Sequence, residues 1–65
     1  MFNIFNLDEV RRINKQQGVK YNIYKLDEKG KPIGLLGTAN TLEEAESIVE
    51  FNKIQFGWIA RIEKL

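Results

Sequence analysis

The stretch YNIYKLDEKGKPIGLLGTANTLEEAESIVEFN, residues 21–52, decides the fold of this 65-residue chain. Its pattern predicts a strand, a tight turn, a second strand and a capped amphipathic helix, in that order. Asp27 opens the turn and Gly30 closes it, which is typical of a type I turn whose last residue takes a positive φ. We therefore expect an antiparallel hairpin between strands at residues 19–26 and 33–39.

The expected register of this hairpin sorts its side chains onto two faces. A three-residue loop with a bulge would place Ile23 opposite Leu35 and Tyr21 opposite Gly37. Alternation along the strands then predicts an inner face and an outer face. The inner face would hold Val19, Tyr21, Ile23, Ile33 and Leu35, and the outer face would hold Lys20, Asn22, Tyr24, Gly34, Leu36 and Thr38.

The segment after the hairpin predicts a helix at residues 41–53. Thr41 and Glu44 form a capping box, the pattern in which each of the two residues satisfies a free backbone N–H at the start of a helix. One side of the helix holds the apolar residues Leu42, Ala45, Ile48 and Val49, together with Asn52. The opposite side is acidic and consists of Glu43, Glu46 and Glu50. We expect the acidic side to be solvated and not to bind a metal, because carboxylates along one straight helix do not converge.

The chain on either side of this unit predicts a further helix and a further strand. Asn6 is a suitable N-cap and Gly18 a suitable left-handed C-cap, so residues 7–17 are expected to form a helix. Residues 1–6 would form an arm or a short strand. Residues 57–63 alternate between apolar and polar side chains, as a last strand would.

These elements predict a single small α+β domain over residues 1–65, with two layers and α-β-β-α-β connectivity. A strand–helix–strand crossover lets the last strand pair antiparallel with the first, which gives a three-stranded antiparallel sheet of order 2-1-3. Pro32 fits the start of the edge strand because proline cannot donate to a ladder. If residues 1–5 pair as a fourth strand, the connectivity becomes β-α-β-β-α-β. The later helix would cover the face of Tyr21, Ile23, Leu35, Trp58 and Ile62.

The composition limits the chemistry that the chain can perform. It has no Cys, no His and a formal charge of +1. Disulfides and the usual zinc sites are therefore excluded, and Ser47, the only serine, has no candidate base beside it. We expect a non-enzymatic protein without a cofactor or a metal. No apolar run approaches the about 20 residues of a membrane span, and we expect a cytoplasmic protein that does not bind membranes.

The outer sheet face suggests where a partner would bind. Tyr24, Leu36 and Ile59 lie on adjacent strands and would form an apolar patch there. Monomers seldom expose a large apolar patch, so the first helix, the N-terminal arm or another protein should cover it. The strand at residues 33–39 also offers an edge for strand addition. The first hypothesis is therefore an interaction or accessory module that binds a protein partner or itself, in the latter case as a homodimer.

A basic surface supports an alternative hypothesis, weak binding of nucleic acid. Basic side chains around an aromatic ring hold single-stranded nucleic acid by phosphate attraction and base stacking. The candidate residues are Arg11, Arg12, Lys15, Lys20, Tyr24 and Arg61. The two arginines could instead pair with Asp8 across one helical turn.

The hairpin and the capped helix that follows it also carry a resemblance. With the Gly30 turn and the run TLEEAE at residues 41–46, they resemble the ββα unit in the amino-terminal DNA-binding domains of some phage and transposon integrases. The resemblance implies DNA binding, and no residue roles are carried over from it. Those domains have three strands before the helix, whereas in this chain a strand follows the helix.

Overall fold

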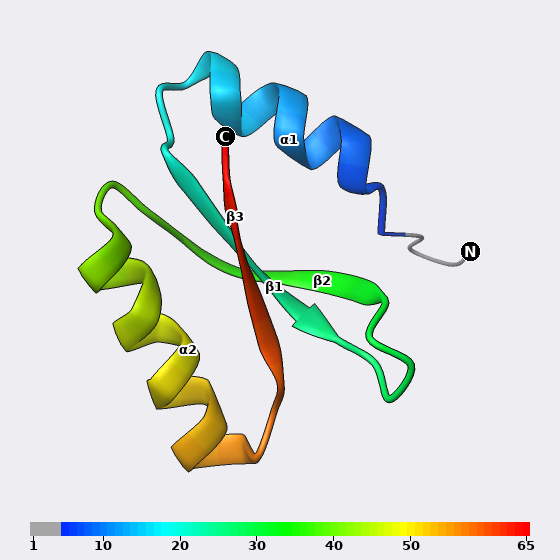
Figure 1. The fold of residues 1–65 in the computed structure, drawn as a ribbon. Coiled ribbons are helices and arrows are strands. Elements are labelled where there is room, and N and C mark those ends of the chain that lie inside the picture. Colours follow the sequence, from blue (N-terminus) through cyan, green and yellow to red (C-terminus); the bar gives the residue numbers. More distant parts are fainter. Residues whose placement is uncertain (1–4) are drawn as a thin grey trace.

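The computed structural model describes residues 5–65, which form two helices and three strands (Figure 1). In chain order these are α1 (Leu7–Gln16), β1 (Tyr21–Leu26), β2 (Pro32–Ala39), α2 (Leu42–Phe56) and β3 (Ala60–Lys64). The strands form an antiparallel sheet of order β2-β1-β3, which confirms the predicted α+β connectivity and the central position of β1. The expected arm or fourth strand falls largely on residues 1–4, which lie outside the described residues.

The hydrophobic core lies between α2 and the inner face of the sheet. Ile23, Ala39 and Ala45 are buried there. Half-buried side chains complete this cluster, namely Tyr21, Leu36, Ile48, Val49, Ala60 and Ile62. At Gly37 the helix comes close to β2, since a β-carbon added to this glycine would lie 3.4 Å from Cδ1 of Ile48. The predicted cover of Ile23 by α2 is therefore confirmed.

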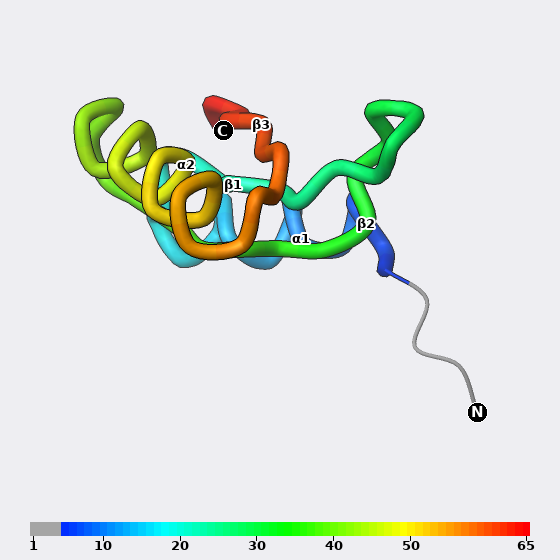
Figure 2. Tube along the Cα trace, turned by 90° about the horizontal axis from the view of Figure 1, so that it is seen from below, coloured from blue at the N-terminus to red at the C-terminus, as the bar shows by residue number. Residues whose placement is uncertain are grey.

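The first helix lies against the opposite face of the sheet. Asn22 and Tyr24, which alternate with Ile23 along β1, are buried on that face. No residue of α1 is itself buried, so this helix contacts the sheet through the ends of its side chains. Figure 2, which looks roughly along α2, shows α1 below β1 and β3 and at the level of β2. The sequence predicts that the first helix, the N-terminal arm or another protein covers the outer face. Within residues 5–65, α1 is the main element that covers it.

The register of the hairpin differs from the prediction. Its loop closes as expected, with Gly30 at a φ of 83°. Beyond the loop, Ile23 pairs with Gly37 and Tyr21 pairs with Ala39, two residues further along β2 than predicted. Two β-bulges cause the difference, because each one adds a residue to β2 without adding one to β1.

The bulges change the face of the sheet on which some β2 side chains lie. They fall at Ile33 and Leu36, which have no partner in the ladder with β1. As a result, Leu35 stands opposite Tyr24 on the outer face, whereas Leu36 packs against the core on the inner face. The sequence placed these two leucines the other way round, and the expected inner position of Leu35 was wrong.

The later helix begins where the sequence predicts and ends later. The hydroxyl of Thr41 accepts a hydrogen bond from the N–H of Glu44 over 3.1 Å, as in a capping box. The helix continues to Phe56, three residues beyond its predicted end, because the left-handed residue that closes it is Gly57, with a φ of 70°. For the same reason β3 begins at Ala60 and not at residue 57.

Candidate functional site

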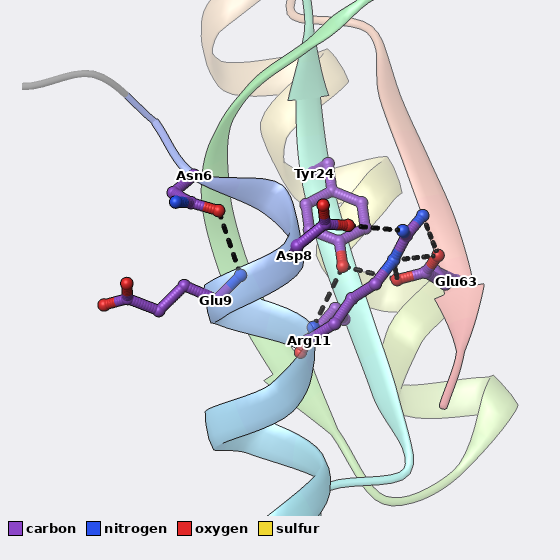
Figure 3. A network of polar contacts seen from close by, with 7 residues as sticks. Asn6, Asp8, Glu9, Arg11, Tyr24 and Glu63 are labelled. Atoms are coloured by element: carbon purple, nitrogen blue, oxygen red, sulfur yellow. Dashed lines mark hydrogen bonds and ion pairs between the residues drawn. The ribbon is translucent and has the colours of Figure 1, made fainter.

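A network of polar side chains joins α1 to the sheet (Figure 3). The Nε of Arg11 donates to both carboxylate oxygens of Glu63, over 2.9 and 2.7 Å, and Nη2 lies 2.6 Å from Oε2. The hydroxyl of Tyr24 donates to Oε1 of the same carboxylate over 2.5 Å. Arg11 also contacts Asp8, one turn earlier in α1, at 3.3 Å. A single carboxylate of β3 therefore binds both the first helix and the central strand.

The network continues beneath the helix through two asparagines. Asn22 donates to the hydroxyl oxygen of Tyr24 over 3.0 Å and accepts a hydrogen bond from Asn14 of α1 over 2.9 Å. The ring of Phe5 meets the Tyr24 ring edge-on, with 6.0 Å between the centroids. Within residues 5–65 every buried side-chain nitrogen and oxygen has a hydrogen-bond partner. A network whose groups are all satisfied fixes the position of a helix, and it leaves no free group there for chemistry.

The ionisable members of the network have perturbed pKa values. The hydrogen bond from Arg11 lowers the pKa of Glu63, against the opposing effect of burial, and the Tyr24 hydroxyl lowers it further. Burial raises the pKa of Tyr24, and its hydrogen bond to Glu63 raises it again. The same carboxylate raises the pKa of Arg11. At neutral pH the network therefore contains a carboxylate, a guanidinium and a neutral phenol.

The expected partner-binding patch on the outer face is not formed. Tyr24 is 0% exposed, because α1 covers it. Leu36 packs on the opposite face, because a bulge turns it towards α2. Only Ile59 is exposed, and it precedes β3. The three residues therefore do not share one surface, and this expectation is corrected.

The predicted nucleic-acid residues are only partly brought together. The buried ring of Tyr24 is not available to stack on a base. Arg61 is exposed and stands opposite Tyr24 in the sheet, and Lys20 is exposed just before β1. Arg11, which faces the sheet, is held by Glu63. The expected arrangement, in which basic side chains surround an accessible Tyr24 ring, is thus absent from residues 5–65.

The other basic residues of α1 line a hollow beside β3. Its volume is about 380 Å³, and it is lined by Asp8, Arg11, Arg12, Lys15, Glu63, Lys64 and Leu65. Lys64 was not among the predicted site residues, because it is distant from α1 in sequence and only the folded sheet brings it there. Arg12, Lys15 and Lys64 are exposed side chains, and the ion pairs of the described residues do not include them.

The later helix exposes several of its large apolar side chains. Its only buried residues are Ala45 and Asn52. Phe51 is 57% exposed and Ile54 is 69% exposed, and both lie on the side away from Ala45. The predicted helix ended before Ile54, so the sequence pattern did not reveal this second apolar side. The α2 outer surface is defined here as Phe51, Ile54 and the flanking glutamates, Glu43, Glu46 and Glu50.

Basic and aromatic side chains lie at the C-terminal end of α2 and in the segment that follows it. The Nζ of Lys25 lies 3.9 Å from the centroid of the Trp58 ring, a cation–π contact. Trp58 in turn stacks on Phe56, with 4.4 Å between the ring centroids. Lys53 is in the last turn of the helix. The N-terminal part of α2 is therefore acidic, and its C-terminal end is basic.

Comparison with known proteins yields no relative from which a function could be transferred. The chain matches no family model, and neither the curated proteins nor the solved structures contain a match to it. Residues 5–65 contain no helix long and apolar enough to cross a membrane. The described residues also contain no group of three or more acidic side chains placed to hold a metal ion. The surfaces described above are therefore the basis for a functional proposal.

The edge strands of the sheet are poorly suited to strand addition. In β2, Ile33 and Leu35 are exposed, but Pro32 lacks an N–H and two bulges interrupt the strand. In β3 the exposed residues include Arg61 and Lys64. Proline, bulges and charged side chains are the features by which natural sheets prevent edge-to-edge pairing. Two surfaces remain as candidate binding sites. The α2 outer surface has exposed apolar side chains beside glutamates, and the hollow is lined mainly by basic side chains.

Proposed function

We propose that the protein is a small non-enzymatic interaction module that binds a second copy of itself through the α2 outer surface. The observation that carries this proposal is that α2 is apolar on two sides. One side packs against the sheet through Ala45, and the other exposes Phe51 and Ile54. A helix with apolar residues on opposite sides is normally covered on both. A partner that packs on α2 would supply the missing cover.

The distribution of charge along α2 favours a second copy as this partner. The acidic residues lie in the N-terminal two thirds of the helix, and Lys53 lies in its last turn. Two such helices packed antiparallel would place the basic end of each beside the acidic part of the other. A contact about a twofold axis is self-complementary in this way, because the same patch is used by both partners. The apolar side chains of Phe51 and Ile54 would then lie on either side of the centre of the contact.

The expected contact is small and therefore reversible. A stable interface buries about 800 Å² on each partner, more than two large side chains and their neighbours can supply. We therefore expect monomers and dimers in exchange, with a dissociation constant in the micromolar range or weaker. Because charges surround the contact, added salt should weaken it.

Sedimentation equilibrium over a concentration series tests the proposal. The wild-type chain should shift from monomer towards dimer as its concentration rises, and Ile54→Asp should remain monomeric. Ile59→Asp is the matched control, because Ile59 is similarly exposed but lies outside α2. A wild-type chain that stays monomeric up to millimolar concentration would contradict self-association. Equal weakening by both variants would contradict the assignment to α2.

A pair of charge reversals tests the antiparallel arrangement. Glu46→Lys and Lys53→Glu should each weaken the homodimer, because each places like charges opposite one another. An equimolar mixture of the two variants should recover association, since the reversed charges complement each other in the mixed dimer. If the mixture associates no better than the separate variants, the antiparallel arrangement is wrong.

A further inference from the structure

We infer that the hollow between α1 and β3 is a binding site for phosphate groups. This inference is independent of the proposed self-association, because a single chain forms the whole hollow. It also replaces the expected nucleic-acid surface with a different set of residues. The central ones are Arg12, Lys15 and Lys64, of which only the first two were predicted.

The charge balance of the hollow favours an anion. Its two acidic side chains, Asp8 and Glu63, both contact the same base, Arg11. The remaining bases, Arg12, Lys15 and Lys64, take part in none of the ion pairs found within residues 5–65. Their side chains come from two elements, α1 and β3, and line one hollow with a volume of about 380 Å³. Like charges held together repel one another, and an anion bound between them removes that repulsion.

The geometry is better suited to phosphate than to carboxylate. A phosphate group carries up to two negative charges on one compact group, so one ligand can neutralise several bases at once. Arginine binds such groups through a planar fork of donors, and lysine binds them as a point charge. The hollow can supply one such fork, from Arg12, beside two lysines. The side chains that line the hollow include four bases and two acids. A single carboxylate would therefore neutralise only half of the net positive charge, whereas a doubly charged phosphate would neutralise all of it.

The Arg11–Glu63 pair has a positioning role at this site. Because it fixes α1 against β3, it sets the separation between the bases of the helix and Lys64. Among residues 5–65, no aromatic side chain lines the hollow. These residues therefore offer no ring for base stacking there, and a nucleic acid would bind them through its backbone without regard to sequence.

An NMR titration of the isotope-labelled chain tests the inference. The probes are inorganic phosphate, tripolyphosphate and oligothymidylate, each added at low salt to Ile54→Asp, so that self-association does not interfere. The expected result is a change in the amide resonances of residues 11–15 and 63–65. Binding of all three probes would identify the phosphate group as the ligand, and binding of oligothymidylate alone would identify a nucleic-acid backbone. If no probe shifts these resonances, the inference is wrong.

Replacing single lysines by uncharged glutamine identifies the basic side chains that contribute to phosphate binding. Lys15→Gln and Lys64→Gln should each weaken binding of tripolyphosphate, whereas Lys29→Gln, in the β1–β2 turn, should leave it unchanged. Three phosphate contacts on a single-stranded ligand predict roughly a 20-fold loss of oligothymidylate affinity between about 50 and about 200 mM salt. Each variant should reduce that salt slope by about 0.7, the contribution of one phosphate contact on a single strand. If Lys29→Gln weakens binding as much as Lys15→Gln and Lys64→Gln do, the attraction is non-specific and the proposed site is wrong. The proposed site is also wrong if polyglutamate binds as tightly as tripolyphosphate.

Discussion

Arg11 and Glu63 are 52 residues apart in the chain, and the guanidinium of the first donates to both carboxylate oxygens of the second. Because α1 buries none of its own residues, this pair and the Asn14–Asn22 hydrogen bond are its main polar attachments to the sheet. The position of the helix thus depends on specific polar contacts more than on apolar burial. It follows that the helix should be the element most easily released from the fold.

Glu63→Gln should loosen α1 and leave the rest of the fold intact. Glutamine keeps the size of the side chain but removes the charge that holds Arg11, so the hydrogen bonds that remain are weaker. Hydrogen exchange should then become faster in α1 and stay slow in β1 and α2. Glu28→Gln, in the exposed β1–β2 turn, is the matched control. Unchanged exchange in α1 would show that the pair does not hold the helix.

The lowered pKa of Glu63 predicts how stability depends on pH in acid. Since its pKa is below the ordinary value of 4.5 in the folded chain, Glu63 stabilises the fold above that pH. The contribution is lost as the pH falls through the folded-state pKa, because the protonated carboxyl no longer attracts Arg11. The urea midpoint of the wild type should therefore fall more steeply below pH 4.5 than that of Glu63→Gln. Parallel pH profiles for the two chains would contradict this role.

Tyr24→Phe should destabilise the fold by about 1–2 kcal/mol. The substitution removes the hydroxyl that links Asn22 to Glu63, and it leaves the buried Asn22 amide without one of its partners. Urea unfolding measures the loss, with Tyr21→Phe as a control on the opposite face. The difference in unfolding free energy between the wild type and Tyr24→Phe should shrink at alkaline pH. Burial raises the pKa of Tyr24 above 10.0, so ionisation of this residue opposes folding of the wild type there. Equal stabilities at neutral pH would show that the hydroxyl is not needed.

Gly37→Val should destabilise the chain, whereas Gly34→Val should not. The β-carbon of the first valine would lie 3.4 Å from Cδ1 of Ile48, and the rest of its side chain would push α2 away from β2. Overpacking of this kind costs about 1–3 kcal/mol. The second valine would enter open space, because no atom lies within 4 Å of a β-carbon at Gly34. Thermal unfolding of the two variants measures the difference, and similar melting temperatures would contradict the close approach of α2.

Local sequence signals determined the elements and their order. The capping box at Thr41, the left-handed glycines and the alternation along β1 each depend on neighbours in the chain, and each appears in the structure. The bulges in β2 could not be predicted in the same way. The neighbouring residues carry no such signal for them, and the sequence therefore placed Leu35 and Leu36 on the wrong faces.

The candidate sites were harder to predict than the fold. Periodicity identified Arg11 and Arg12 as basic residues of a helix. It could not show that Glu63 binds the first, whereas the second forms no ion pair within residues 5–65. Lys64 joins the hollow only because β3 ends beside α1. The apolar outer side of α2 depends on where the helix ends, and a predicted end at residue 53 excluded Ile54 from it.

The most direct test of α2 as the self-association surface is to follow the amide resonances of the wild-type chain during dilution. The proposed dimer predicts concentration-dependent shifts that are confined to residues 43–56 and are absent in Ile54→Asp. Spectra that do not change with concentration would contradict self-association, and shifts confined to β2 or to α1 would place the contact on another surface.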